Sequence, residues 1–251
     1  MFHPNPILAV LFDLDGTLRH NQPNSFETFI EYLGELGYTL NQAQLQHGER
    51  WSHYYWSISP NLKADLEEFG GQNSAFWTRH AERQLRVMKV DGDIPALARQ
   101  INQLFEERYL PSNYIPDDVM PTLTRLRAAG YTLGLVSNRT EPLDAVVAEI
   151  GLEKIFNFTL SAGQAQSWKP DPKIFRRAAA LAQCLPEAVV YVGDNFYADV
   201  EGARGVGMHP VLVDPKRIFP EPGCPVIRAL SELETALEYL GTNAESPASV
   251  S

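Results

Sequence analysis

Short apolar runs that alternate with helical patterns constrain the fold of this chain more than any other feature. The runs cover residues 7–13, 132–137, 158–161, 188–193 and 208–213, and helical patterns fill the gaps between the last four. Each run is apolar along almost its whole length, which is typical of parallel strands that helices cover on both faces. The sequence therefore predicts an α/β fold built on a doubly wound parallel sheet.

Helix signals between the runs support this alternation. The helices predicted at residues 119–129 and 143–150 each end at a glycine, the residue that most readily adopts a left-handed C-terminal cap. A third helix begins at Asp171, with Pro172 in its first turn, as helix starts favour. Helices are thus predicted between consecutive strands, as a doubly wound sheet requires.

A long stretch at residues 23–108 breaks the alternation, because apolar side chains recur there at helical spacing throughout. Breaks that contain glycine or proline divide it into four or five helices. The flanking segments 19–22 and 111–117 carry Pro, Asn and Ser and are predicted to form two hinge strands. We predict a core domain at residues 1–18 and 117–241, an inserted helical domain at 19–116, and a disordered polar tail at 242–251.

The composition limits the partners that this chain can have. Of its 251 residues, 44% are hydrophobic and 21% are charged, as in soluble globular proteins. A net charge of −10 repels polyanions, which argues against a nucleic-acid partner. The two cysteines lack metal-ligand spacing and no apolar stretch reaches membrane length, so we expect a cytoplasmic protein with no membrane contact. No pattern predicts an oligomeric state.

Polar residues stand at the ends of several predicted strands. The stretch LFDLDGTL ends the first run with Asp13 and Asp15, and Ser137 and Asp194 end two later runs. The carboxyl ends of parallel strands meet at one edge of the sheet, where doubly wound folds bind ligands. An ionised carboxylate at such a place is costly to desolvate without a cation or hydrogen-bond donors. The paired aspartates therefore predict a positive group beside them.

Four short stretches combine into one pattern. They are DLDGT at 13–17, SN at 137–138, KPDP at 169–172, and GD at 193–194 followed by Asp199. Alone, each is equally well explained by a solvated turn, a helix cap or a surface charge. Together, in this order, they resemble the four motifs of the haloacid dehalogenase-like hydrolases. The resemblance implies a Rossmann-like core and identifies the helical insertion as a C1-type cap that selects the substrate.

The resemblance also implies an activity, that of a Mg²⁺-dependent phosphatase acting on a small phosphorylated metabolite. Asp13 would be the nucleophile that forms an aspartyl-phosphate, and Asp15 would serve as the acid and then the base. The spacing of Asp194 and Asp199 leaves open which of the two contacts the metal. In the implied site, Asp13, the Asp15 backbone carbonyl and Asp194 hold Mg²⁺, Ser137, Asn138 and Lys169 bind the phosphate, and Thr17, Asn195 and Asp199 support these ligands.

Other proteins of this superfamily have the same fold but catalyse different reactions. Haloacid dehalogenases lack the second aspartate, and phosphonate-cleaving relatives replace it with alanine, so Asp15 argues against both activities. A sugar phosphomutase keeps all four motifs and is the main enzymatic alternative. A non-catalytic binding protein on the same fold is a second alternative, although such a protein has no need for an intact nucleophile and metal site.

Side chains outside the four motifs give weaker signals. Trp51, Tyr54 and Tyr55 lie at helical spacing, which favours packing between helices over a substrate-stacking surface. Arg83 belongs to a basic helical stripe, for which a solvated face is favoured over an anion-binding surface. Arg139 is expected to be an exposed loop arginine, with a contact to the phosphate as the alternative.

Overall fold

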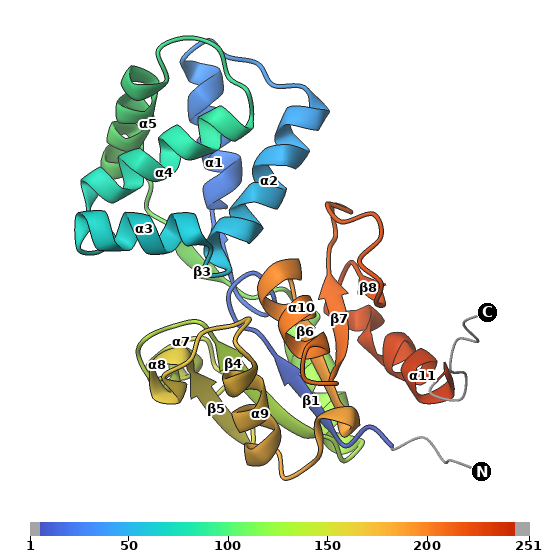
Figure 1. The fold of residues 1–251 in the computed structure, drawn as a ribbon. Coiled ribbons are helices and arrows are strands. Elements are labelled where there is room, and N and C mark those ends of the chain that lie inside the picture. The colour runs from blue at the N-terminus through green and yellow to red at the C-terminus, as the bar shows by residue number, and fades with distance from the viewer. Residues whose placement is uncertain (1–5, 244–251) are drawn as a thin grey trace, which may run out of the picture. The chain divides into compact units, whose positions relative to one another are not determined.

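In the computed structural model, which describes residues 6–243, the chain divides into two compact units (Figure 1). The core unit consists of Met1–Arg19 and Ile115–Ser251, and the helical unit of His20–Tyr114. The tail predicted at 242–251 lies outside the described residues, apart from Thr242 and Asn243, which end the last helix. No helix among residues 6–243 is both long enough and apolar enough to span a membrane. The cytoplasmic location and the role of the helical unit as a cap stay predictions.

A parallel sheet forms the centre of the core unit. Among the described residues it has six strands in the order β5-β4-β1-β6-β7-β8. Strand β1 pairs with β4 on one side and with β6 on the other, so the strand order reverses at β1 and the predicted doubly wound sheet is confirmed. The strands are β1 (Ala9–Phe12), β4 (Thr132–Ser137), β5 (Phe158–Ser161), β6 (Val189–Gly193), β7 (His209–Val213) and β8 (Val226–Ile227).

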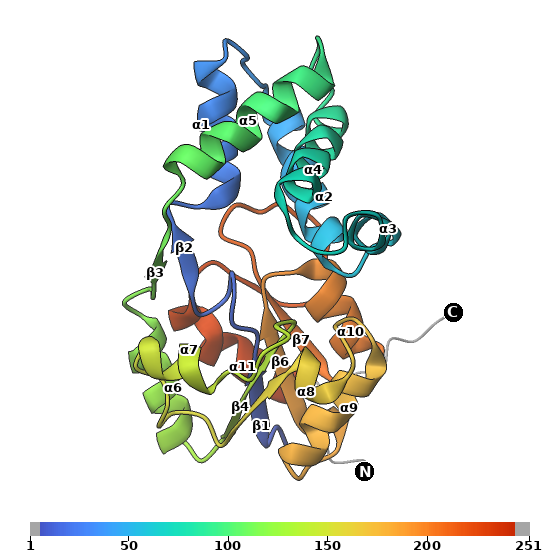
Figure 2. The same cartoon turned by 90° about the vertical axis from the view of Figure 1, so that its left-hand side faces the viewer.

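Helices cover both faces of this sheet, as Figure 2 shows. Val10 and Phe12 of β1 pack into the core on one face, and Ala9 and Leu11 pack into the core on the other. Because a strand that is buried on both faces needs an apolar residue at every position, β1 is an unbroken apolar run in the sequence. One face carries α6 (Val119–Ala128), α7 (Asp144–Glu149) and α11 (Leu233–Asn243), and the other carries α8 (Ala162–Ala165), α9 (Pro172–Leu181) and α10 (Glu201–Arg204).

Several short elements of the core unit are absent from the sequence prediction, among them β8 and a π-helical turn. Strand β8 has two residues, too few to show a hydrophobic pattern. A single π-helical turn, Phe196–Val200, follows β6. The Asn195 side chain caps it by accepting hydrogen bonds from the Tyr197 and Ala198 backbone N–H groups at 3.1 and 3.0 Å. This turn carries Asp199, so an element that leaves no periodic signal positions a predicted site residue.

The helical unit contains five helices and one antiparallel strand pair. Strand β2 (His20–Gln22) pairs with β3 (Ser112–Tyr114), so the two segments predicted as strands on either side of the insertion form one ribbon. The helices are α1 (Ser25–Glu35), α2 (Gln42–Trp56), α3 (Pro60–Phe69), α4 (Ser74–Val87) and α5 (Ile94–Arg108). Each begins after a side chain that accepts backbone hydrogen bonds, namely Asn24, Asn41, Ser59, Asn73 and Asp93.

A buried polar network joins α2, α3 and α4. The fully buried Asp65 accepts hydrogen bonds from two Arg83 nitrogens at 2.8 and 2.7 Å and from the Tyr55 hydroxyl at 2.9 Å. Arg83, expected on a solvated face, is 26% exposed and pairs with a buried carboxylate. Tyr55 is buried as predicted, whereas Tyr54 is 39% exposed and lies outside this core. Burial also lowers the pKa of His80, whose ring contacts Tyr55, to about 4.

Candidate active site

The predicted site residues of the core unit come from separate segments that meet at the carboxyl edge of the sheet. Asp13 follows β1, Ser137 ends β4 and Asp194 follows β6, and these three strands are neighbours. Lys169 reaches the same place from the segment before α9, and Asp199 reaches it from the π-helical turn. Strand β1 is the point where the strand order reverses, the usual ligand site of a doubly wound sheet.

Lys169 lies between two carboxylates. Its Nζ atom is 2.5 Å from Asp13 Oδ1 and 2.6 Å from Asp199 Oδ1, and none of the three side chains is more than 8% exposed. Burial by itself lowers the pKa of Lys169, but attraction to Asp13 and Asp199 outweighs it, and the pKa lies well above its ordinary value. Lys169 is therefore a fixed positive charge beside Asp13.

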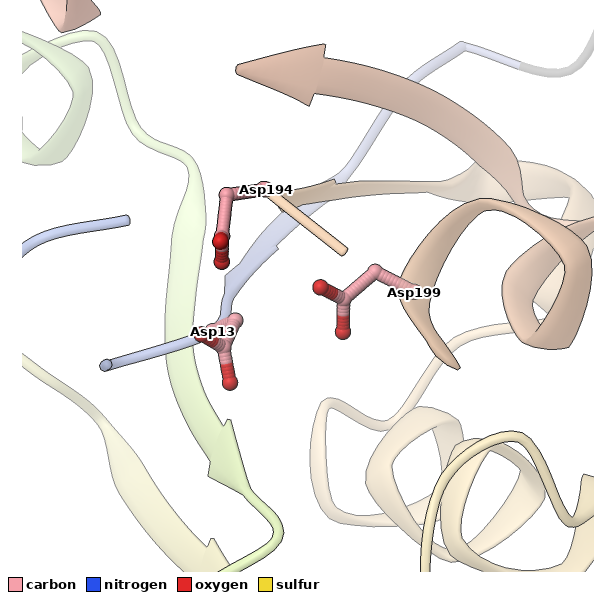
Figure 3. A group of neighbouring side chains, drawn as sticks. All are labelled: Asp13, Asp194 and Asp199. Atoms are coloured by element: carbon pink, nitrogen blue, oxygen red, sulfur yellow. The ribbon is translucent and has the colours of Figure 1, made fainter. Parts of the chain in front are cut away.

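Three carboxylates lie close together at this edge of the sheet (Figure 3). Oxygen atoms of Asp13, Asp194 and Asp199 all lie within 4.8 Å of one another. Burial, reinforced by repulsion from a neighbouring carboxylate, raises the pKa of Asp13 and that of Asp194 to about 7, although Lys169 opposes the shift. One ammonium group cannot neutralise three carboxylates, so the charge balance favours a divalent cation. A donor set made of oxygen atoms alone suits Mg²⁺.

The turn after β1 connects two of these carboxylates. The Thr17 hydroxyl lies 3.4 Å from Asp13 Oδ2 and 3.2 Å from Asp194 Oδ1, within hydrogen-bonding reach of both. Gly16 has a φ of +94°, and a Cβ atom added there would lie 2.4 Å from Asp194 Oδ2. Position 16 therefore requires glycine for its backbone conformation and for the close approach of Asp194.

Asp199 is anchored through both of its oxygens. Oδ1 accepts a hydrogen bond from Lys169 Nζ, and Oδ2 accepts one from the Asn195 backbone N–H at 3.0 Å. Gly193 lies so near that an added Cβ atom would be 2.3 Å from Asp199 Oδ2. Because both oxygens already accept hydrogen bonds from fixed donors, Asp199 is suited to hold Lys169 in place.

Asn138 fastens the Lys169 segment to the end of β4. Its Nδ2 donates to the Lys169 carbonyl at 3.1 Å, and its Oδ1 accepts from the Lys169 backbone N–H at 2.6 Å. Ser137 is buried beside it and accepts a hydrogen bond from the Arg139 backbone N–H at 3.3 Å. The Asn138 amide thus positions Lys169, and the phosphate contacts of Ser137, Asn138 and Lys169 stay predictions.

Two arginines contact Asp15, and the sequence prediction includes neither contact. Arg139 donates from Nε to Asp15 Oδ2 at 2.7 Å and from Nη2 to Oδ1 at 2.8 Å, and Arg19 Nη1 donates to Oδ1 at 3.0 Å. Arg139 lies in the loop after β4 with its side chain 37% exposed, as expected, but it contacts Asp15, which was not predicted from the sequence. Arg139 lies two residues after Ser137, the last residue of β4, but nothing in the sequence around it indicates that its partner is Asp15.

The fold and the buried acidic site together are those of an α/β enzyme. A model of the haloacid dehalogenase-like hydrolases matches residues 7–207, most of the chain. The chain therefore belongs to the haloacid dehalogenase-like hydrolases. This confirms the family that the four motifs predict and the enzyme class, a hydrolase.

Similar proteins extend this result. The human haloacid dehalogenase-like hydrolase domain-containing protein 3 is 36% identical over 231 residues, which are 91% of this chain and 88% of that protein. A glyceraldehyde 3-phosphate phosphatase from Methanopyrus kandleri is 28% identical over 82% of this chain and 84% of its own length. The crystal structure of a phosphatase of this superfamily from Thermococcus onnurineus matches with a TM-score of 0.52 at 24% identity, covers 92% of this chain and 97% of its own, and confirms the fold.

Proposed function

We propose that this protein is a Mg²⁺-dependent phosphatase that hydrolyses a small phosphorylated metabolite through an aspartyl-phosphate on Asp13. One observation carries the proposal. The Asp13 carboxylate is buried at the end of the central strand, 2.5 Å from Lys169, with two more carboxylates beside it. Family membership supports the proposal, as does a relative whose name is that of a phosphatase for a small phosphorylated compound.

In the first half of the proposed reaction, Asp13 attacks the phosphorus while Asp15 gives a proton to the departing oxygen. The bond between phosphorus and the leaving group breaks, and the phosphoryl group stays on Asp13. In the second half, Asp15 takes a proton from a water molecule, which attacks the phosphorus and releases phosphate. Lys169 and the Ser137 hydroxyl face the phosphoryl oxygens, and charge and hydrogen bonds from these two residues stabilise the transferring group.

The metal in this proposal is held by the Asp13 and Asp194 carboxylates and by the Asp15 backbone carbonyl. When all three carboxylates are ionised, the cluster of Asp13, Asp194, Asp199 and Lys169 carries a charge of −2. When bound, Mg²⁺ supplies the positive charge that balances these carboxylates and the phosphoryl oxygens. Asp199 acts through Lys169 rather than through the metal.

A phosphate-release assay tests the proposal. We expect Mg²⁺-dependent hydrolysis of p-nitrophenyl phosphate that a chelator abolishes and added Mg²⁺ restores, and faster release from at least one member of a panel of metabolite phosphates. A sugar phosphate that is isomerised in the presence of glucose 1,6-bisphosphate, with little free phosphate, would instead indicate a phosphomutase. If no compound in the panel releases phosphate, that result would contradict a phosphatase and favour a binding protein.

A further prediction concerns Gly16. We expect Gly16→Ala to lower Mg²⁺-dependent phosphate release by at least about tenfold, because the new methyl group displaces the Asp194 carboxylate. The positive φ adds about 1 kcal/mol of strain, measurable as a lower free energy of unfolding in urea. Gly130→Ala is the matched control, since its φ is +91° but an added Cβ has no neighbour within 4 Å. Gly130→Ala should lower the free energy of unfolding but leave phosphate release unchanged. Equal activity of the two variants would contradict the close approach of Gly16 to the Asp194 carboxylate.

A further inference from the structure

We propose that Arg139 is a positioning residue that orients Asp15 for taking the proton from water when the phosphoenzyme is hydrolysed. The inference rests on the proposed function of the same site. It adds a role for a residue outside the four sequence motifs, and it assigns the proton to one oxygen of Asp15.

The contacts of Asp15 define that oxygen. A carboxylate offers about four lone-pair positions, two on each oxygen. Oδ1 accepts hydrogen bonds from Arg139 Nη2 at 2.8 Å and from Arg19 Nη1 at 3.0 Å. Oδ2 accepts one from Arg139 Nε at 2.7 Å. Oδ1 is therefore fully used by the two arginines, and Oδ2 is the atom with a lone pair for a proton from water.

Arg139 is built to fix this orientation. Its Nε and Nη2 atoms lie in one plane and donate to both oxygens of the Asp15 carboxylate. Such a paired contact restricts rotation of the carboxylate, whereas a single contact does not. The hydrogen bond to Asp15 raises the pKa of Arg139, so the guanidinium keeps its charge. The backbone N–H of Arg139 donates to Ser137 Oγ, which ties the arginine to the end of β4.

Solvent access distinguishes the two aspartates of the DLDGT stretch. The Asp15 side chain is 37% exposed, whereas the Asp13 side chain is 8% exposed. Water can therefore reach Asp15, while Asp13 is shielded. An exposed ion pair contributes little to stability by itself. The paired contact of Arg139 and the additional contact of Arg19 therefore serve to orient the Asp15 carboxylate and not to stabilise the fold.

Arg139 assists the hydrolysis of the phosphoenzyme. A water oxygen forms a bond to the phosphorus of the phosphoenzyme, and one water proton goes to Asp15 Oδ2. The bond between phosphorus and the Asp13 oxygen breaks, and its electron pair returns to the Asp13 carboxylate. Inorganic phosphate leaves, and the proton on Asp15 is ready for the next leaving group.

The test measures two steps separately with p-nitrophenyl phosphate, whose leaving group needs little acid assistance. Phosphoenzyme formation is followed by the rapid release of p-nitrophenol, and phosphoenzyme hydrolysis by quenching at intervals after substrate is removed. We expect Arg139→Gln to slow hydrolysis by about ten- to a hundredfold, the cost of a misplaced catalytic group, and to change formation by less than about threefold. In the Asp15→Asn background, Arg139→Gln should have no further effect on hydrolysis.

Two variants distinguish the orientation of Asp15 from the charge of residue 139 and from a nonspecific loss of activity. Arg139→Lys keeps the charge without the paired contact and should recover only a small part of the lost hydrolysis rate. Arg125→Gln removes an exposed arginine of the core unit that pairs with Glu234 at 2.9 Å, and it should leave both steps unchanged.

Three results would contradict a positioning role for Arg139. Full recovery by Arg139→Lys, equal slowing of both steps, or an undiminished effect of Arg139→Gln in the Asp15→Asn background would overturn the positioning role. If the wild type and Asp15→Asn form no phosphoenzyme at all, the proposed function fails together with this inference. That outcome is distinct, because it is seen before Arg139 is changed.

Discussion

The Asp13→Asn variant is expected to lose phosphate release by about 10⁴-fold or more at saturating Mg²⁺ and p-nitrophenyl phosphate. Asparagine has nearly the same shape as aspartate, but its amide cannot form the acyl-phosphate, so the reaction loses its nucleophile. The measurement is kcat from initial rates, with enough enzyme to detect the residual activity. Activity within tenfold of the wild type would show that Asp13 is not the nucleophile.

Stability provides the control for this variant. The pKa of Asp13 is 3.8 in its ordinary state and about 7 in the folded chain, so above pH 7 the ionised carboxylate disfavours folding. In the absence of metal, the free energy of unfolding of Asp13→Asn should therefore rise relative to that of the wild type between pH 4 and pH 8. Lys169 is charged across this range, so the loss of its partner shifts the free energy of unfolding equally at the two pH values. A large loss of stability instead would mean that lost activity reports misfolding.

The Asp194→Asn variant should have the second-largest effect, on the requirement for Mg²⁺. A carboxylate that contacts the metal cancels its charge directly, so its loss should raise the Mg²⁺ concentration for half-maximal activity by more than about a hundredfold. Asp199→Asn is the matched variant, because Asp199 lies in the same cluster but uses both oxygens on Lys169 and Asn195. It should raise the Mg²⁺ requirement by about tenfold or less.

Activity alone does not separate the two aspartates, since Asp199→Asn also disturbs Lys169. Titration calorimetry with Mg²⁺ and no substrate measures the metal affinity directly. A weaker affinity in Asp199→Asn than in Asp194→Asn would reverse the two roles and make Asp199 the metal ligand.

Much of the sheet could be predicted because strands buried on both faces leave a strong pattern. The runs at 132–137 and 158–161 coincide with β4 and β5 to the residue. The first run is longer than β1, since Leu8 is apolar but half exposed and lies before the paired residues. Strand β8 could not be predicted, because two residues form no period.

The site could be predicted in part because its residues belong to motifs at strand ends, and the ends of neighbouring parallel strands converge. Asp13 and Asp194 meet in the structure for this reason, and Lys169, which begins the KPDP stretch, joins them from the segment before α9. Arg139 and Arg83 could not be placed in the same way. Each is a single arginine whose partner, Asp15 or Asp65, is distant in sequence, so its environment depends on tertiary packing alone.

The most direct test of the account is to trap the phosphoenzyme on the Asp15→Asn variant. Loss of the base should slow hydrolysis of the intermediate, while the good leaving group of p-nitrophenyl phosphate allows it to form. After acid quench and digestion, mass spectrometry should find one phosphoryl group on the peptide that contains Asp13, and neutral hydroxylamine should remove it. Phosphate release by this variant without a labelled Asp13 peptide, or a phosphoryl group on another residue, would contradict the account.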